Sequence, residues 1–444
     1  MNIALCAPRH LDSALAWRPQ GAVSLRQFLA DAQALAALLP ASPWLLNVCQ
    51  DRYHFAVGLV AGMLGGKTSL QPASQSAETL AQLAHAYPGA LCLHDTPFEA
   101  GEIPCLAYPE TLAAPLEPVT AVPDFPAGFI AVILFTSGST GQPKPQAKSW
   151  GDLVLSAQAQ AARLGQDRQP HAIVGTVPVQ HSYGFESTLM LALQGGCSFW
   201  AGKPFYPQDI ATALAAVPEP RLLVTTPFHL SALLNAEIPL PPVQMLLSAT
   251  APLSTELAAR AEARCAAPVL EIYGSTETGQ LASRRTTAGD IWQLMPGTRL
   301  EQRDDITLAH GSYIPEPLPL GDIVELCGPD TFRLLGRNND LINIAGKRTS
   351  LAYLNHQLTS IPGVQDGAFY LPDEEKPDGI SRLTAFVVAP DLSREALLAQ
   401  LRQRLDPVFL PRPLQLLAAL PRNSTGKLTR EALLDLHRQC QPAR

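Results

Sequence analysis

Short apolar runs alternate with longer amphipathic stretches over the first part of the chain. An Ala/Leu stripe predicts a helix over 25–39, and a second helix is predicted over 55–64, where two glycines close it. The apolar runs 44–49, 69–70 and 91–93 predict strands. Strands that alternate with helices usually pair in parallel inside a covered sheet, so we expect the chain to open with an α/β layer.

The same alternation continues through the middle of the chain, after a proline-rich stretch, 104–126, that predicts a linker. One helix is predicted to begin near Ser149, and another at Thr255, with Ser254 as its capping residue. An apolar helix is predicted over 187–193. Further apolar runs predict strands over 129–135, 176–185 and 245–253, and a strand with a turn over 222–227.

The segment from 340 to the C-terminus has a different pattern. A short helix, 351–358, two strands, 367–371 and 383–388, and an amphipathic helix, 394–405, predict a compact α+β domain. A chain of 444 residues is too long for one ordinary core, so at least two domains are expected. The predicted fold class is α/β, with a large N-terminal domain of layered sheets and helices and a small C-terminal α+β domain.

A stretch rich in glycine and hydroxyl groups follows the predicted strand 129–135, and it reads Thr136-Ser137-Gly138-Ser139-Thr140-Gly141-Gln142-Pro143-Lys144. Its glycines allow positive φ angles and a close backbone approach, and its hydroxyls and Lys144 supply donors and a charge. A strand, such a loop and then a helix are predicted to bind a triphosphate. The alternative is a flexible surface turn. A Walker A loop does not fit, because G-x-x-x-x-G-K-[ST] cannot be aligned here.

Charge and cysteine use narrow the class of protein. A net charge of −7 argues against a general nucleic-acid binder. The eight cysteines are scattered without a C-x-x-C pair, which fits neither a zinc cluster nor a disulfide framework and favours reduced thiols in a cytoplasm. No basic-then-apolar leader is evident, and no uncharged apolar run is long enough to span a membrane. We therefore expect a cytoplasmic protein without a membrane span.

Two stretches carry a resemblance. The first, 136–144, resembles T-S-G-S-T-G-x-P-K, a signature of the adenylate-forming enzymes: acyl-CoA synthetases, aryl-CoA ligases, peptide-synthetase adenylation domains and luciferases. The second, 273–277, is similar to the Y-G-x-T-E signature of the same family. The family usually has Gly where this chain has Pro145, a change expected to stiffen the end of the loop. The resemblance implies that the chain binds ATP with Mg²⁺ and activates a carboxylic acid.

The resemblance implies a role for each residue type of the second stretch. Tyr273 is expected to stack on adenine, and Gly274 to let the acyl group pass close to the backbone. Thr276 is expected to donate a hydrogen bond to the α-phosphate. Glu277 is expected to hold Mg²⁺, a hard cation that prefers oxygen ligands. The alternative is an ordinary β-turn with a solvated glutamate.

Three further positions are expected to contact the nucleotide. The small residues around Ala251 are expected to lie against adenine, with a strand-to-helix turn as the alternative. Asp322 is expected to accept hydrogen bonds from the ribose hydroxyls, but Asp after Gly is also common in turns. Arg337 stands in a segment similar to the family's G-R-x-D-D motif, and it is expected to contact ribose or phosphate.

The stretch 181–185 is expected to wall a pocket for the acid, because many acyl and aryl ligases have a histidine or an aromatic residue there. A lone histidine is, however, more often structural. The predicted pocket residues are His181, Phe185, Thr225, Ser248, Gly274 and Gly279. Family members that activate amino acids usually have Asp where this chain has Ser182. A buried ammonium needs a charged partner, so an α-amino acid substrate is not expected.

The resemblance also implies that the C-terminal domain is a mobile lid. Residues 1–338 are expected to form the AMP-binding domain and 339–444 the lid. Asn339 is the expected hinge, where the family usually has Asp or Lys, and Asn tolerates unusual backbone angles. Lys427 stands in a stretch similar to the family's P-x-x-x-x-G-K motif, and it is expected to bridge the attacking carboxylate and the α-phosphate.

Two half-reactions are expected. First, a carboxylate attacks the α-phosphorus of ATP, giving an acyl-adenylate and pyrophosphate, with Lys427, Thr276 and Glu277 as catalytic residues. The lid then rotates, which brings Gly346 and Arg348 toward the site. A thiol of CoA or of an acyl carrier protein takes the acyl group, and AMP leaves.

The acid is expected to be aromatic. The stretches S-A-T-A-P-L-S from Ser248 and A-G-K-R-T-S-L-A-Y-L-N-H-Q-L from Ala345 resemble the compact ligases of aryl-polyene and xanthomonadin-type pigment clusters. Those enzymes load an aromatic acid such as 4-hydroxybenzoate or a cinnamate. A medium- or long-chain fatty acid is the alternative substrate. Transfer of the adenylate to an amine, and a non-catalytic nucleotide-binding regulator or scaffold, are the alternatives of other kinds.

Overall fold

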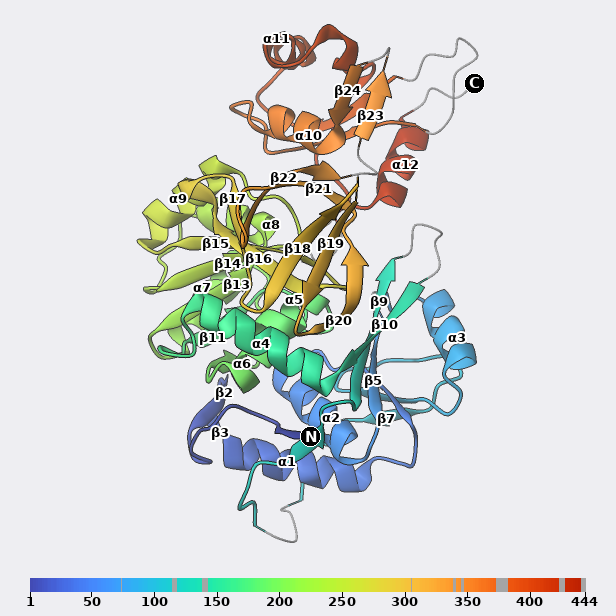
Figure 1. The fold of residues 1–444 in the computed structure, drawn as a ribbon, viewed down its shortest axis with the longest axis vertical. Coiled ribbons are helices and arrows are strands. Elements are labelled where there is room, and N and C mark those ends of the chain that lie inside the picture. Colours follow the sequence, from blue (N-terminus) through green and yellow to red (C-terminus); the bar gives the residue numbers. More distant parts are fainter. Residues whose placement is uncertain are drawn as a thin grey trace. The chain divides into compact units, whose positions relative to one another are not determined.

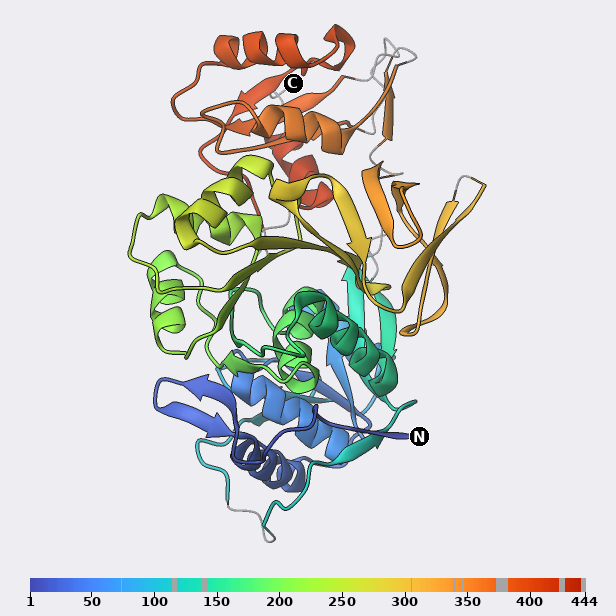
Figure 2. The same cartoon turned by 60° about the vertical axis from the view of Figure 1, so that its left-hand side comes forward.

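The chain divides into two compact units, shown in sequence colours in Figure 1 and Figure 2. Unit 1 comprises Met1–Leu300 and Ala309–Leu318, and unit 2 comprises Glu301–Leu308 and Pro319–Arg444. The computed structural model describes residues 1–72, 74–113, 118–137, 143–304, 306–337, 341–344, 347–372, 382–422 and 428–440. The predicted domain boundary between 338 and 339 lies outside these residues and stays a prediction. In the described part of the chain, no helix is long and apolar enough to cross a membrane.

Unit 1 contains a first sheet with the strand order β10-β9-β5-β4-β6-β7. Its strands are β4 (Trp44–Asn47), β5 (Thr68–Gln71), β6 (Leu91–His94), β7 (Cys105–Ala107), β9 (Ile130–Ser137) and β10 (Pro143–Ser149). β4 pairs in parallel with β5 and β6, and β5 pairs in parallel with β9, which confirms the predicted parallel layer. β10, which the sequence pattern did not predict, folds back antiparallel on β9 at the edge of the sheet.

Three helices lie near the first sheet in the chain and in Figure 1: α1 (Leu25–Leu38), α2 (Arg52–Leu64) and α3 (Ala77–Ala86). α2 packs on β4 and β5, and α1 packs on α2. The first two confirm predicted helices, and each begins where a side chain satisfies exposed N–H groups. Ser24 accepts a hydrogen bond from the N–H of Gln27 at the start of α1. At the start of α2, Asp51 accepts from the N–H groups of Tyr53 and His54. Two leucines of α3 join the apolar core of the sheet.

A second sheet in unit 1 has the strand order β17-β16-β15-β14-β13-β11-β12-β2-β3. Its strands are β2 (Ala14–Arg18), β3 (Gly21–Ser24), β11 (Ala172–Gly175), β12 (Ser198–Trp200), β13 (Arg221–Thr225), β14 (Met245–Ser248), β15 (Val269–Ser275), β16 (Gly279–Arg285) and β17 (Ile291–Leu294). The strands from β12 to β15 run parallel, so their carboxyl ends share one edge of the sheet. β15 and β16 form an antiparallel hairpin inside the sheet.

Helices cover both faces of the second sheet. Helices α7 (Pro207–Ala215), α8 (Pro227–Asn235) and α9 (Thr255–Cys265) share one apolar core with its strands. In Figure 2, α4 (Trp150–Leu164) lies on the other side, between the strands of the two sheets. Ser149, near which a helix was predicted to begin, caps α4 through the N–H of Asp152, and Ser254 caps α9 through the N–H of Leu257, as predicted.

The predicted strand over 176–185 is wrong. β11 ends at Gly175, and a helical segment follows, made of α5 (Ser182–Gly184), a π-helical turn (Phe185–Met190) and α6 (Leu191–Gln194). Pro178 has no N–H to donate to a strand ladder. The His181 side chain then begins the helix by accepting a hydrogen bond from the N–H of Tyr183.

Two other predicted stretches are shorter or more structured than expected. The predicted strand 245–253 ends at Ser248, where β14 stops. The predicted linker, 104–126, carries a strand near each end: β7 joins the first sheet, and β8 (Asp124–Pro126) pairs with β1 (Asn2–Ala4). The start of the chain is therefore held against the segment that leads into β9.

Unit 2 has the predicted α+β character. It contains the hairpins β21 (Asp322–Leu326)–β22 (Thr331–Arg337) and β23 (Leu341–Ile344)–β24 (Lys347–Ser350). A small sheet has the order β25-β26-β27, with β25 (Asp366–Tyr370), β26 (Thr384–Val388) and β27 (Leu414–Leu416). Helices α10 (Leu351–Thr359) and α11 (Arg394–Arg404) bury apolar side chains against it, and α12 (Arg430–Gln439) packs half-buried leucines there.

Candidate active site

The glycine- and hydroxyl-rich stretch belongs to the β9–β10 hairpin. In the pairing of the two strands, Thr136 stands opposite Lys144, and Ser137 stands opposite Pro143. Lys144 is exposed. Four predicted phosphate-binding residues lie outside the described residues: Gly138, Ser139, Thr140 and Gly141.

The loop does not run directly into a helix, as a phosphate-binding strand-loop-helix unit would. β10 intervenes, and α4 begins only at Trp150. A helix N-terminus is therefore not the anion site that follows this loop. The chemistry proposed for the first motif rests on the loop itself and on Lys144.

The second motif forms the turn of the β15–β16 hairpin. Thr276 and Glu277 lie in the turn and are half-buried. Gly274 approaches the facing strand so closely that a Cβ atom there would stand 2.1 Å from the carbonyl oxygen of Gly279. Gly279 itself has a φ of +67°, a conformation that favours glycine. Both glycines are thus required by the turn, whatever passes beside them.

A buried network supports the strand below this turn. The Tyr273 ring packs on Trp292 with 5.6 Å between centroids, and the Arg284 guanidinium lies 4.5 Å from the Trp292 ring. Arg284 also pairs with the buried carboxylate of Glu271 over 2.7 Å. Glu271 in turn accepts a hydrogen bond from the N–H of Leu253 over 2.9 Å, which ties the segment that contains Ala251 to β15.

The predicted acid-pocket residues gather at the carboxyl edge of the second sheet. Thr225 ends β13 and stands opposite Ser248, which ends β14. The Tyr183 hydroxyl donates to the carbonyl of Leu247 over 2.9 Å, so the helical segment that begins after His181 is tied to the end of β14. Ligands of open parallel sheets bind beyond the carboxyl ends of the strands, which is where these residues lie.

Burial and bonding differ among the pocket residues. Phe185, Thr225 and Ser248 are buried, and His181 is half-buried. The Thr225 hydroxyl accepts a hydrogen bond from Thr176 over 3.2 Å. The Ser248 hydroxyl has no hydrogen-bond partner among the described residues. Buried hydroxyls are normally paired, so Ser248 is the pocket residue with unused bonding capacity.

Unit 2 carries the remaining predicted residues. Asp322 and Arg337 stand opposite each other in the β21–β22 hairpin, so the two residues predicted to contact ribose or phosphate are register partners. Arg348 lies in β24. Lys427, Asn339 and Gly346 lie outside the described residues. Their roles stay predictions.

The sequence reasoning missed two charged residues beside the second motif. The Lys148 ammonium, from β10, donates to the carbonyl of Glu277 over 2.6 Å. Glu186 is buried in the π-helical turn and accepts a hydrogen bond from Ser182 over 2.7 Å. Burial lowers the pKa of Lys148 and raises the pKa of Glu186. A charge inside an apolar helical run could have drawn attention to Glu186, whereas a lysine on an edge strand is ordinary.

The arrangement of carboxylates fits Mg²⁺ bound together with a nucleotide. Among the described residues, no group of three or more His, Cys, Asp or Glu side chains could hold a metal ion by itself. Mg²⁺ usually takes one or two carboxylates and completes its shell with phosphate and water oxygens. A single half-buried carboxylate, Glu277, in a turn beside the predicted nucleotide site suits that mode of binding.

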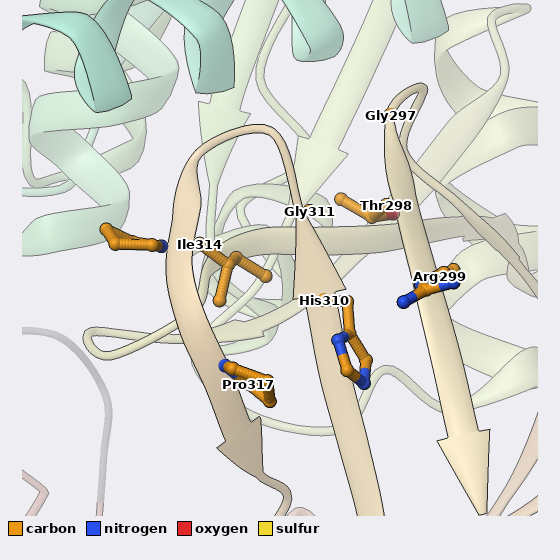
Figure 3. A pocket seen from close by; sticks show the side chains of 8 residues that line it. Gly297, Thr298, Arg299, His310, Gly311, Ile314 and Pro317 are labelled. Carbon is orange, nitrogen blue, oxygen red and sulfur yellow. The ribbon is translucent and has the colours of Figure 1, made fainter.

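A separate hollow of about 500 Å³ lies on unit 1 (Figure 3). It is framed by parts of β18 (Thr298–Arg303), β19 (Ile306–Gly311) and β20 (Ile314–Pro319). Its lining residues are Gly297, Thr298, Arg299, His310, Gly311, Ile314, Pro315 and Pro317. No predicted site residue is among them, so this hollow is not part of the candidate active site.

Solved structures with this fold include o-succinylbenzoate CoA synthetase from Bacillus subtilis. In complex with its acyl-adenylate intermediate, that enzyme matches with a TM-score of 0.79 at 20% identity, over 97% of this chain and 96% of that one. In complex with ATP and a magnesium ion, it matches with a TM-score of 0.78 at 20% identity, over 95% of this chain and 96% of that one. This likeness defines the class: the fold is that of the adenylate-forming enzymes, as predicted.

The sequence comparisons give the family. A family model described as AMP-binding enzyme matches residues 49–313. The chain is 32% identical to the 4-coumarate–CoA ligase of Rhodobacter capsulatus over 297 residues, which are 66% of this chain and 73% of that protein. It is 24% identical to the 3-hydroxybenzoate–CoA/4-hydroxybenzoate–CoA ligase of Thauera aromatica over 371 residues, which are 73% of this chain and 69% of that protein.

The chain belongs to the AMP-binding enzyme family. The predicted identity as an AMP-forming ligase that uses ATP is thereby confirmed. These matches disfavour the alternative of a non-catalytic regulator or scaffold, because the similarity to enzymes extends beyond two short motifs to most of the chain.

Proposed function

We propose that this enzyme is an acid–thiol ligase that adenylates an aromatic carboxylic acid and transfers the acyl group to CoA. 4-Hydroxybenzoate or a cinnamate is the proposed acid. The observation that carries the proposal is the position of the Tyr273–Gly279 turn beside Thr225 and Ser248 at the carboxyl edge of the parallel strands. The relatives in Rhodobacter capsulatus and Thauera aromatica support it, because their names give CoA ligation of aromatic acids.

The first half-reaction needs no general base. A carboxylic acid is already ionised at neutral pH, so it attacks the α-phosphorus of ATP directly, and pyrophosphate leaves. The residues must place two negatively charged reactants in line and offset their repulsion. We assign this work to the Thr276 hydroxyl and to Lys427. Mg²⁺, for which Glu277 is the proposed ligand, would neutralise charge on the phosphates when bound.

In the second half-reaction, residues of the C-terminal lid that serve adenylation are proposed to leave the site, and others that serve thioester formation are proposed to enter it. The proposed rotation about Asn339 withdraws Lys427 and brings Gly346 and Arg348 toward the adenylate. The thiol sulfur then attacks the acyl carbon and releases its proton to solvent, and AMP leaves with the electron pair of the broken acyl–phosphate bond. CoA is the proposed acceptor because the relatives are CoA ligases, and the thiol of an acyl carrier protein is the alternative. The cytoplasm is the proposed location, in keeping with eight free cysteines.

Pyrophosphate release with Mg-ATP tests the proposal most directly. The panel contains hydroxylated benzoates, cinnamates, short-chain acids and long-chain fatty acids, all without amino groups. We expect a sharp response to one or a few aromatic acids, and thioester formation when CoA is added. A response to fatty acids alone would keep the mechanism and overturn the substrate. No pyrophosphate release with any acid of the panel, in a protein that binds ATP, would favour a non-catalytic role.

The choice of acceptor needs a second assay on the acid that gives the best response. CoA and a carrier protein with its pantetheine arm are supplied separately at equal concentration. A thioester on CoA at the rate of pyrophosphate release supports CoA as acceptor. Release of AMP that requires the carrier protein would make that protein the acceptor instead.

A further inference from the structure

Lys148 joins the two nucleotide motifs of unit 1. It lies near the end of β10, the strand that leaves the predicted phosphate loop, and it shares a face of that strand with Lys144 by the two-residue period of strands. Its ammonium donates to the carbonyl of Glu277, 129 residues further along the chain, over 2.6 Å. A side chain from the first motif's hairpin therefore holds the backbone of the second motif.

Burial lowers the pKa of the Lys148 ammonium, and neighbouring carboxylates partly offset this effect. Burial disfavours the charge, while three carboxylates favour it: Glu186 in the π-helical turn, Asp152 in the first turn of α4, and Glu277 itself. Glu186 is held in turn by the Ser182 hydroxyl over 2.7 Å. A charged donor makes a stronger hydrogen bond to a carbonyl than a neutral donor does.

The elements beside this contact pack at ordinary van der Waals distance. A Cβ atom on Gly279 would stand 3.5 Å from Oε2 of Glu186 and 3.5 Å from the hydroxyl of Ser156. The turn, the π-helical segment and α4 thus meet around the same few atoms. Loss of the Lys148 contact would release the turn at the Glu277 carbonyl, while the packing of Gly279 beside Glu186 and Ser156 would remain.

We propose that Lys148 is a positioning residue for Glu277, and that it fixes the metal-binding turn relative to the phosphate-binding hairpin. The carbonyl that Lys148 holds belongs to the same residue as the proposed Mg²⁺ ligand. Holding that carbonyl fixes the backbone from which the carboxylate projects. The carboxylate is then already in position when the ion binds. The inference rests on the proposed function of Glu277 as a Mg²⁺ ligand, and it adds Lys148 as the residue that supports Glu277 in that function.

Lys67 provides a matched control. Lys67 is buried, whereas Lys148 is half-buried, and the Lys67 ammonium likewise donates to a backbone carbonyl, that of Ser42, over 3.2 Å. That contact joins the chain before β4 to the chain before β5, in neither nucleotide motif. Replacing either lysine with methionine removes a charged donor from a carbonyl, so the two variants lose the same kind of bond.

The experiment measures ATP binding at equilibrium on the full chain, with and without Mg²⁺, for the wild type, Lys148→Met, Lys148→Arg and Lys67→Met. The factor by which Mg²⁺ tightens ATP binding is the readout. We expect Lys148→Met to reduce this factor about tenfold, Lys148→Arg to restore most of it, and Lys67→Met to leave it unchanged. In turnover, Lys148→Met should raise the KM for Mg-ATP and leave the KM for the acid unchanged.

A double-mutant cycle that combines Lys148→Met with Glu277→Gln tests whether Lys148 acts through Glu277. In that background, Lys148→Met should have almost no further effect on the Mg²⁺ factor. An unchanged factor in Lys148→Met alone, or a full additional loss in the Glu277→Gln background, would overturn the inference. If Lys148→Met does not fold, Lys148→Gln, which keeps a shorter neutral donor, takes its place with the same criteria.

Failure of the proposed function looks different from failure of this inference. A wild type that binds ATP more tightly with Mg²⁺, yet releases no pyrophosphate with any acid, would refute the reaction and leave the positioning role open to the same binding cycle. A wild type that turns over aromatic acids, with a Lys148→Met variant of equal Mg²⁺ factor, would refute only the positioning role.

Discussion

The two nucleotide motifs of unit 1 are both parts of antiparallel hairpins, yet the sheets hold them differently. The first motif belongs to β9–β10, where β10 is the edge strand of the first sheet. The second belongs to β15–β16, which has β14 on one side and β17 on the other. The edge hairpin exposes Lys144 and Pro145, whereas the inner hairpin buries Glu271 and Ser283.

This difference explains how the chain tolerates Pro145. A proline cannot donate to a strand ladder, and edge strands are where sheets accept one. In the first motif, therefore, sequence changes act on the ligand more than on the fold. In the second motif, the turn continues from β15, whose Glu271 pairs with Arg284 of β16 and helps to hold the sheet together. The following substitutions test this division.

Glu271→Ala should have the largest effect, on folding itself. The substitution leaves the Arg284 guanidinium without its carboxylate in a site where the two side chains are 18% and 5% exposed. Breaking a buried pair on one side costs about 3–5 kcal/mol of unfolding free energy. Urea unfolding of the purified chain measures this cost.

The neighbouring pair of Glu262 and Arg285 is the control for that experiment. Its arginine is 52% exposed, and the two side chains lie 2.8 Å apart. Solvent screens such a pair, so Glu262→Ala should cost no more than about 1 kcal/mol. Equal costs for the two alanine variants would contradict the view that the inner hairpin depends on its buried charge pair.

Lys427→Ala should leave both hairpins intact and remove chemistry alone. We expect adenylate formation to fall by about 10²–10³-fold, the usual effect of losing one transition-state donor. ATP binding and the unfolding midpoint should stay close to those of the wild type. Single-turnover measurement of the adenylate checks the rate. Adenylate formation at the wild-type rate would remove Lys427 from the mechanism.

Lys144→Ala should weaken the nucleotide without weakening the fold. Its side chain is exposed on an edge strand, so the unfolding free energy should change by less than about 0.5 kcal/mol. Loss of one charged contact to a phosphate should weaken ATP binding about tenfold. Nucleotide titration and urea unfolding of the same preparation give both numbers. A large loss of stability would show that the edge hairpin is as structural as the inner one.

The smallest expected effect concerns acid stability. The hydrogen bond from Arg285 lowers the pKa of Glu262 to about 2, below the ordinary value for glutamate. A lowered pKa stabilises the fold above the unfolded value, and this contribution disappears as the pH falls from about 5 toward 2. Glu262→Gln should therefore flatten the loss of stability over that range by less than about 1 kcal/mol. Thermal unfolding at stepped pH measures it, and Asp12→Asn gives a second test on another pair, because Arg26 likewise lowers the pKa of Asp12.

Much of the fold could be predicted from local sequence. The capping residue Ser254 located the start of one helix, and apolar runs located four strands of the first sheet but only β13 and β14 of the second. The edge strand Pro143–Ser149 could not be found that way, because its sequence, P-K-P-Q-A-K-S, has no apolar alternation. The segment 176–185 was assigned to the wrong structure because a short apolar run fits a strand and a buried helix equally well.

The candidate site divides in the same way. Residues of one turn, such as Gly274 and Glu277, could be proposed from the sequence because the whole motif is continuous, and their roles stay predictions. Lys148 could not, since its importance depends on a contact with another element, and Glu186 offered only the signal of a charge inside an apolar run. Ser248 was predicted as a pocket residue, but only the structure reveals that its buried hydroxyl lacks a partner among the described residues.

The cysteines give the chain a practical property. Cys105 in unit 1 and Cys327 in unit 2 are exposed, whereas the other six are buried or half-buried. A donor and an acceptor dye attached to these two native thiols would report the separation of the units by energy transfer, without engineered labelling sites. Recorded with ATP, with the acid and with CoA in turn, that signal would follow each stage of the proposed cycle in real time.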